Sequence, residues 1–240
     1  MTNSRAGKGD TAPLVLDHFN KPALTTRVLS ALVLAPPVLA AIYFGSPYFD
    51  FLVIAAAALM LWEWKRMGGF VLKRAHLAAA GILYAVIPCA ALLFLRGGAE
   101  SGRETVFWLF ALAWATDIGS YGFGLAIGGP KLAPAISPQK TWAGFFGGVF
   151  CAGLIGFAAA LILSKSSVAP LILASLLLGV AAQAGDLFES WIKRRFKVKD
   201  ASNIIPGHGG IHDRVDGLFA IAVAAAAIDL IFIDGFLLWL

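Results

Sequence analysis

Seven apolar runs divide the chain, and each approaches the length of a helix that crosses a lipid bilayer. They cover residues 28–44, 49–62, 77–95, 105–127, 142–163, 170–188 and 218–240. A hydrocarbon core of about 30 Å requires about 20 apolar residues per helix. The second run is short, and Pro36 and Pro37 interrupt the first. We expect an all-α integral membrane protein, a polytopic bundle of about seven transmembrane helices, with six to nine acceptable.

Small residues mark one face of the fifth run. They recur at every fourth position, at Gly144, Gly148, Ala152, Gly156 and Ala160. Such a ridge lets helix backbones approach closely in lipid. We interpret it as helix packing within one bundle, and we leave a homodimer open.

The composition supports the membrane assignment. Hydrophobic residues make up 59% of the 240 residues and charged residues 14%, against about 45–50% and about 25% in soluble chains. A soluble core of this size could not bury that much apolar surface. The net charge of +5 arises beside the apolar runs, which favours anionic headgroups and phosphates over nucleic acid. Cys89 and Cys151 lie inside apolar runs and are interpreted as packing residues.

Lysine and arginine are unevenly distributed between the two sides of this arrangement. With the N-terminus in the cytoplasm, 16 of the 19 basic residues fall on the cytoplasmic side, as the positive-inside rule requires. We therefore expect a cytoplasmic tail over residues 1–26 and a single transmembrane domain over residues 27–240 in the inner (cytoplasmic) membrane. Loops 128–141 and 189–217 are expected to face the cytoplasm, and the C-terminus the outside.

The densest charge lies in the segment 185–217. Five of the seven residues 193–199 are cationic, and aspartates surround them. A topology anchor would explain the cations, but not the interleaved carboxylates or the sequence PGHGG at 206–210, whose glycines let a backbone approach a ligand. Cations suit a triphosphate, and carboxylates suit Mg²⁺ that shares phosphate oxygens. The pattern predicts a phosphate and Mg²⁺ site.

A second polar segment, 128–148, has a weaker signal of the same kind. Ser137, Lys140 and Thr141 offer two hydroxyls and an ammonium group within five residues. No GxxxxGK[ST] phosphate loop occurs in the chain. The segment is a stronger candidate for phosphate binding because it is expected on the same membrane face as residues 185–217.

These residues occur in an order that resembles the signature of phosphatidate cytidylyltransferases. Residues 190–216 read SWIKRRFKVKDASNIIPGHGGIHDRVD, and they fill every position of S-x-aliphatic-KR-x4-KD-x-small-x2-aliphatic-P-x-HGG-aliphatic-x-DR-aliphatic-D. The stretches around Asp186 and Lys140 are also similar to that family. The resemblance is good over residues 117–217, with one departure at Ala143, where many relatives carry an acidic or amide residue.

The resemblance implies a nucleotidyltransferase that converts CTP and phosphatidate to CDP-diacylglycerol and pyrophosphate, with Mg²⁺ and with a second cation left open. A phosphate monoester already carries close to two negative charges at neutral pH, so it needs no activating side chain. We expect direct in-line attack of the lipid phosphate on the α-phosphorus, with metal and fixed cations stabilising the leaving pyrophosphate. CTP, phosphatidate and membrane lipids are the expected partners.

The expected roles follow the motif. For Mg²⁺ we predict Asp186, Asp213 and Asp216. The predicted catalytic set is Lys193, Arg194, Lys199, Asp200, His208 and Arg214. The predicted substrate-binding set is Ser137, Lys140, Thr141, Ser190, Gly209 and Gly210.

Several alternatives are weighed against this reading. A lipid or ion transporter could use the basic loop to bind headgroups, but its polar groups should continue through the bilayer. A CDP-alcohol phosphotransferase would need alanine and arginine shortly after Asp216-Gly217, where Leu-Phe-Ala-Ile follows. Asp117, in the middle of the fourth run, is either a functional carboxylate or a helix-to-helix hydrogen-bonding group. His208 and His212 are unsuited to zinc, because glycines separate them and no third ligand is evident.

Overall fold

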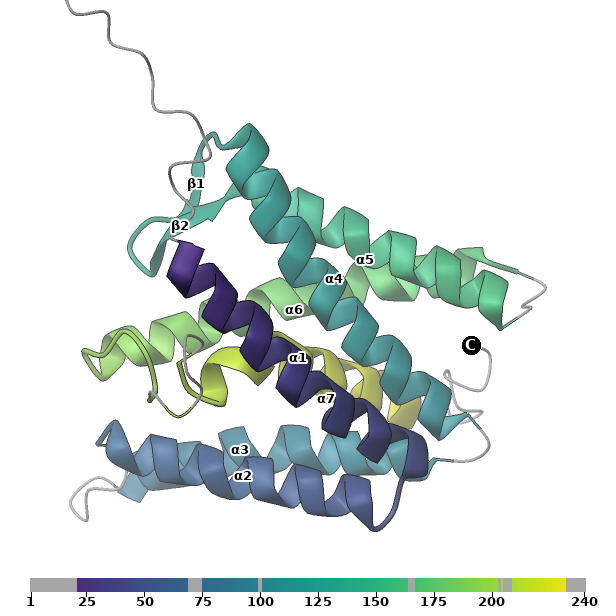
Figure 1. Cartoon of the computed structure of the whole chain (residues 1–240), viewed down its shortest axis with the longest axis horizontal. Helices are drawn as coiled ribbons and strands as arrows, with labels where there is room; N and C mark the ends of the chain where they lie inside the picture. Colours follow the sequence, from purple (N-terminus) through teal and green to yellow (C-terminus); the bar gives the residue numbers. More distant parts are fainter. Residues whose placement is uncertain are drawn as a thin grey trace, which may run out of the picture.

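The computed structural model describes residues 21–68, 75–98, 101–163, 167–202, 204 and 209–231, with backbone alone for residues 21–29 and 31. This part of the chain is helical apart from one small hairpin, which confirms the all-α prediction (Figure 1). The helices are α1 Lys21–Phe44, α2 Tyr48–Arg66, α3 Ala75–Gly97, α4 Gly102–Ile127, α5 Trp142–Ile162, α6 Ala169–Arg195 and α7 His212–Ile231, and the strands are β1 Lys131–Ala133 and β2 Ser137–Thr141.

The helices form two groups that meet at α7 and α4. α4, α5 and α6 pack on one another, and α6 also packs on α7. α2 pairs with α3, and α3 packs on α7 and on α4, while α1 contacts α2 and α4 (Figure 1). The interior is apolar, with Leu109 and Leu112 of α4 and Ile221 of α7 fully buried. α7 and α4 therefore hold the α2–α3 pair against the rest of the bundle.

The ridge of small residues packs as the sequence predicts. Gly144, Gly148, Ala152, Gly156 and Ala160 are all buried along α5. A Cβ atom at Gly148 would overlap the Ser120 hydroxyl of α4 and the Gln183 amide of α6, and these two groups hydrogen-bond to each other. The glycines thus let three helices meet at close range.

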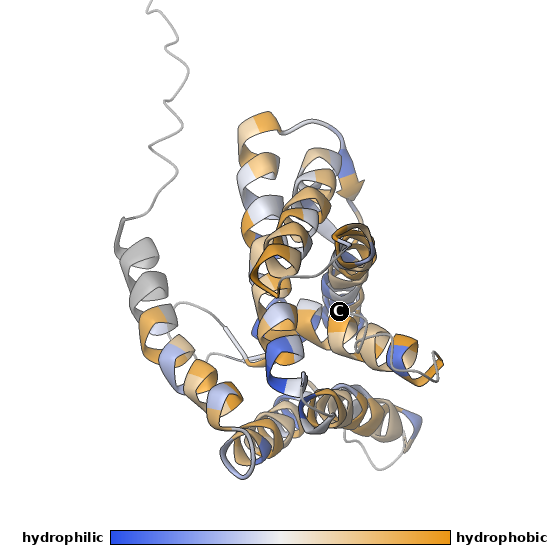
Figure 2. Ribbon diagram, turned by 90° about the vertical axis from the view of Figure 1, so that its right-hand side faces the viewer, coloured by the Kyte–Doolittle hydropathy of each residue, from blue (hydrophilic) through white to orange (hydrophobic). Residues whose placement is uncertain are grey.

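Apolar side chains also cover the outside of the protein. Phe51, Ile118 and Ile162 are at least 70% exposed, and apolar residues line the helices over most of their length (Figure 2). α3, α5 and α6 are long and apolar enough to cross a membrane, judged by length and composition within the described residues. Soluble proteins rarely expose apolar surface of this extent to water, so these helices indicate a membrane protein.

Two helices extend further into the charged segment than the sequence predicts. α6 ends at Arg195 and α7 begins at His212, so the predicted loop 189–217 is helical at both ends. Basic residues at 193–195 favour the last turn of α6 because they face the negative end of the helix dipole. At the other end of the chain, α1 begins at Lys21, inside the stretch 1–26 predicted to be a tail, and residues 1–20 lie outside the described part.

Candidate active site

A β-hairpin brings the first polar segment to the second. β1 and β2 pair antiparallel, with Lys131 opposite Thr141. The Thr141 hydroxyl then accepts a hydrogen bond from the Gly144 N–H at 3.1 Å and caps the start of α5. Arg194, in the last turn of α6, donates from Nε to the carbonyl oxygen of Ile136 at 3.2 Å, between the two strands. The two segments that sequence analysis singled out therefore touch.

Lys193 is the centre of a buried ion-pair network between α6 and α7. Its ammonium group lies 2.6 Å from a carboxylate oxygen of Glu189, one turn earlier on α6, and 2.6 Å from one of Asp213 on α7. The side chains of Lys193, Glu189 and Asp213 are 13%, 3% and 6% exposed. One Lys193 ammonium thus pairs with two carboxylates and ties the two helices together at the point where the charged loop joins them.

Asp213 organises the loop as well as the ion pair. Its second carboxylate oxygen accepts hydrogen bonds from the backbone N–H groups of Gly210 at 2.8 Å and Ala201 at 3.2 Å. Burial by itself would raise the pKa of Asp213, but the Lys193 ammonium and these two N–H groups outweigh it and hold that pKa below its usual range. Asp213 is therefore a firmly ionised group at the first turn of α7, ahead of the apolar part of that helix.

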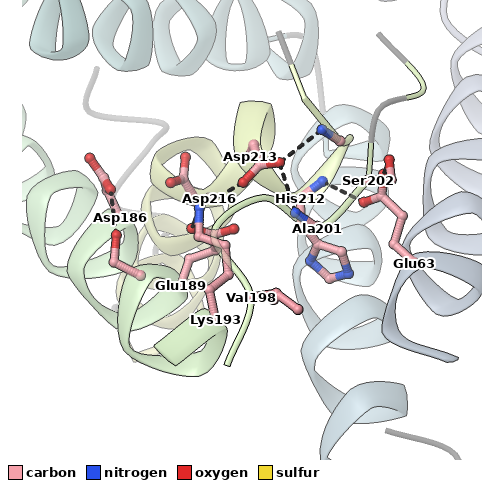
Figure 3. Close-up of polar contacts among 12 residues, drawn as sticks. Glu63, Asp186, Glu189, Lys193, Val198, Ala201, Ser202, His212, Asp213 and Asp216 are labelled. Atoms are coloured by element: carbon pink, nitrogen blue, oxygen red, sulfur yellow. Dashed lines mark hydrogen bonds and ion pairs between the residues drawn. The ribbon is translucent and has the colours of Figure 1, made fainter. Parts of the chain in front are cut away.

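Glu63 of α2 is a polar residue of this region that sequence analysis missed. Its carboxylate is fully buried, and it accepts hydrogen bonds from the Ser202 hydroxyl and from the backbone N–H groups at the start of α7 (Figure 3). The signal in the sequence was a lone carboxylate between two tryptophans at the end of an apolar run. An ionisable residue in such a position is a functional candidate by default.

Lys140 of the hairpin faces the carboxylates of α6. Its ammonium group lies 2.5 Å from Asp186, and the Ser190 hydroxyl lies 3.5 Å from the other oxygen of the same carboxylate. Asp117 of α4 interacts electrostatically with Asp186, Lys140 and Arg214. The intramembrane carboxylate weighed in the sequence therefore belongs to the same polar cluster, below the hairpin.

Within the described residues the cluster holds more acidic than basic side chains. It contains five carboxylates, those of Asp117, Asp186, Glu189, Asp213 and Asp216, against three cations, Lys140, Lys193 and Arg214. Glu189, moreover, has a buried oxygen that receives no hydrogen bond. Such an excess favours the binding of a further cation.

The three aspartates predicted to bind Mg²⁺ differ in their surroundings. Asp186 and Asp216 interact electrostatically with each other and face each other across α6 and α7 (Figure 3). Both oxygens of Asp213 are engaged by Lys193 and by backbone N–H groups of the loop, whereas those of Asp186 lie against the side chains of Lys140 and Ser190. In the described ranges no three His, Cys, Asp or Glu side chains are arranged to hold a metal. Asp186 and Asp216 still fit Mg²⁺, which binds through one or two carboxylates and keeps waters and substrate phosphates as its other ligands.

The remaining predicted residues have varied positions. Lys199 and Asp200 are exposed, Arg214 is engaged with other groups, and His208 lies outside the described residues. Gly209, at φ +83°, and Gly210 are sites of close backbone approach within the protein, while their predicted approach to a substrate stays a prediction. The groups approached are the Asp213 carboxylate at Gly209 and the Glu63 carboxylate at Gly210.

The fold and the cluster define a class of protein: a helical membrane protein with a cluster of carboxylates and cations where three helices and a hairpin meet. The profile of the Cytidylyltransferase family matches residues 68–232, and the chain belongs to this family. It is 44% identical over 178 residues to a phosphatidate cytidylyltransferase of Brucella suis, covering 74% of this chain and 62% of that protein. It is 37% identical over 209 residues to a phosphatidate cytidylyltransferase of Rickettsia bellii, covering 84% and 89%. The match thus spans less than two thirds of the Brucella protein, but most of the Rickettsia one.

Proposed function

We propose that this protein is a phosphatidate cytidylyltransferase, which transfers the cytidylyl group of CTP to phosphatidate. The observation that carries the proposal is the joining of Lys140, Asp186, Lys193, Asp213 and Asp216 into one cluster at the end of apolar helices. Such a site can meet a lipid headgroup and a soluble nucleotide together. The names of the relatives support the same reaction.

We further propose that about seven helices cross the inner membrane, with the cluster on its cytoplasmic side. The bias of lysine and arginine toward one side supports this orientation. α2, α4 and α7 carry Glu63, Asp117 and Asp216 within their helical length, and only α3, α5 and α6 meet the length and composition of a membrane span among the described residues. In the proposed bundle these carboxylates face other helices, so the charge does not meet lipid.

The reaction needs positioning and charge neutralisation more than acid–base chemistry. A phosphate oxygen of phosphatidate forms a bond to the α-phosphorus of CTP, and the bond from that phosphorus to the bridging oxygen breaks, releasing pyrophosphate. Lys140, Arg194 and Arg214 supply fixed positive charge for the triphosphate and the leaving group. Lys199, exposed on the loop, adds to this charge.

Other residues hold the geometry. Lys193 pairs with both Glu189 and Asp213, so we assign it to the structure of the loop as well as to the field at the phosphates. Ser137 and Thr141 lie on the hairpin strand that leads to Lys140, and Ser190 lies beside Asp186. Asp186 and Asp216 would hold Mg²⁺, which when bound neutralises phosphate oxygens as charge develops on them.

The test is pyrophosphate release by the purified protein in detergent. We expect release from CTP that requires added phosphatidate and Mg²⁺ and that falls by orders of magnitude in Asp216→Asn. Glu104→Gln, in the first turn of α4 at the end remote from the hairpin, is the matched control and should retain activity. A well-folded protein that binds phosphatidate but releases no pyrophosphate in any lipid would refute the proposal and favour a transporter.

A further inference from the structure

We propose that Glu63 is a positioning residue of the active site, which from α2 fixes the first turn of α7 and thereby the places of Asp213 and Asp216. The proposal rests on the proposed function for its consequences in catalysis. The contact it describes, between an early helix and the turn that carries two site aspartates, is independent of that function.

Every oxygen of the Glu63 carboxylate is used. Oε1 accepts from the Ser202 hydroxyl at 2.5 Å and from the Ile211 N–H at 2.9 Å, and Oε2 accepts from the His212 N–H at 2.9 Å. The residue is 0% exposed. A buried carboxylate is tolerated only with such a set of donors, so these contacts hold Glu63 in one position and hold the turn against it.

The donors that Glu63 satisfies include the N–H groups with which α7 begins. The first N–H groups of a helix have no partner within that helix, and a negative charge there is also favoured by the helix dipole. Asp213, inside the same turn, accepts from Gly210. Asp213 from the turn itself and Glu63 from a distant helix therefore both bind the N–H groups at the start of α7 and fix its position.

Further contacts hold α2 against the same turn. The His212 ring nitrogen Nε2 lies 3.0 Å from the carbonyl oxygen of Met60, one turn before Glu63. The ring stacks on Tyr84 of α3 with centroids 5.4 Å apart and an angle of 9° between the planes. A Cβ atom at Gly210 would overlap the Glu63 carboxylate, so the backbone approaches closely here. The turn is thus fitted to α2 and α3 on one side.

The other side of the turn leads straight to the site. Asp213 follows His212 directly and binds Lys193 at 2.6 Å. Asp216 lies three residues on and interacts with Asp186 and Glu189. A shift of the turn by the loss of Glu63 would therefore move two aspartates relative to α6, which packs on α4, α5 and α7. Mutation of residues that orient the groups of a site typically lowers activity about 10–100-fold.

The test compares Glu63→Gln and Ser202→Ala with the control Glu104→Gln. An amide at position 63 offers one acceptor oxygen and turns a donor toward an N–H of the turn, whereas Ser202→Ala removes a single donor. We expect Glu63→Gln to lower kcat for pyrophosphate release about 10–100-fold, with KM for CTP unchanged. Ser202→Ala should lower kcat less, and Glu104→Gln should match the wild type.

The second measurement needs no activity. Lys197 and Lys199 are exposed and lie shortly before Ser202, which binds Glu63. Because this contact restrains the backbone, trypsin should cut the folded wild-type protein after these lysines slowly. It should cut Glu63→Gln there faster. Unchanged cleavage would overturn the proposal even if the wild type proves inactive, because the loop would then be held without Glu63. A kcat that falls only in proportion to the folded fraction, measured by size-exclusion chromatography, would also overturn it. Wild-type protein that releases no pyrophosphate while Glu63→Gln is cut faster would refute the proposed function and retain the contact.

Discussion

Lys193→Met tests whether the buried ion pairs hold α6 against α7. The change replaces the ammonium by an apolar group of similar length and leaves Glu189 and Asp213, 3% and 6% exposed, without that counter-charge. Removing one partner of a buried pair costs about 3–5 kcal/mol. In a chain of this length about 1 kcal/mol lowers Tm by about 2–4 °C. We therefore expect a fall of about 6–20 °C, measured by tryptophan fluorescence in detergent near pH 7.

Two further variants separate the ion pair from other effects. Lys199→Met makes the same chemical change at an exposed position of the loop, where surface charges contribute little, and should leave Tm unchanged. Lys193→Met combined with Glu189→Gln should recover part of the loss, because the double variant buries one fewer unpaired charge. A Tm for Lys193→Met equal to that of Lys199→Met would refute the reasoning.

Three other expectations follow from single contacts. Thr141→Ala removes the cap of α5 and should cost about 1 kcal/mol in thermal unfolding, while Thr141→Ser should not; equal losses would exclude capping. Gly148→Ala forces a methyl group onto Ser120 and Gln183 and should cost about 1–3 kcal/mol, whereas Gly122→Ala, in open space, should cost nothing; similar Tm values would show that α4, α5 and α6 are not closely packed. The pKa of Asp213 is lower in the folded protein than in the unfolded chain. As the pH falls, Asp213 therefore binds a proton in the unfolded chain before it does so in the folded protein. Its contribution to stability is thus complete above the ordinary aspartate pKa of about 4 and is lost as the pH falls through the lower folded value. As the pH falls below about 4, the Tm of Asp213→Asn should therefore decrease less steeply than that of the wild type. Parallel curves of Tm against pH would contradict this.

The helices were predictable because each one contains a long apolar run. The ends of α6 and α7 were not, because charged residues there extend helices through contacts that the local pattern does not reveal. Lys193 pairs with Glu189 one turn away, which a helical spacing suggests, but also with Asp213 across the loop. The hairpin was missed because its strands are three and five residues long and carry no alternating pattern.

The candidate site could be predicted as a set of residues but not as a network. Asp186, Lys140 and Asp216 were all singled out, and the structure brings them into one cluster. Their partners are separated in sequence, so spacing could not show that Asp213 is engaged by Lys193 rather than open toward a ligand. Glu63 was passed over because the second predicted apolar run ends at Trp62, one residue before it.

The dependence of the α7 turn on α2 has a consequence for the order of synthesis. The groups that satisfy Glu63 lie 139 to 149 residues later in the chain. At a translation rate of about 5–20 residues per second, α2 is made about 7–30 s before them. During that interval Glu63 must remain hydrated or protonated, because a bare carboxylate is not stable in lipid. The site is therefore completed by one of the last helices to emerge, and α2 reaches its final position only then.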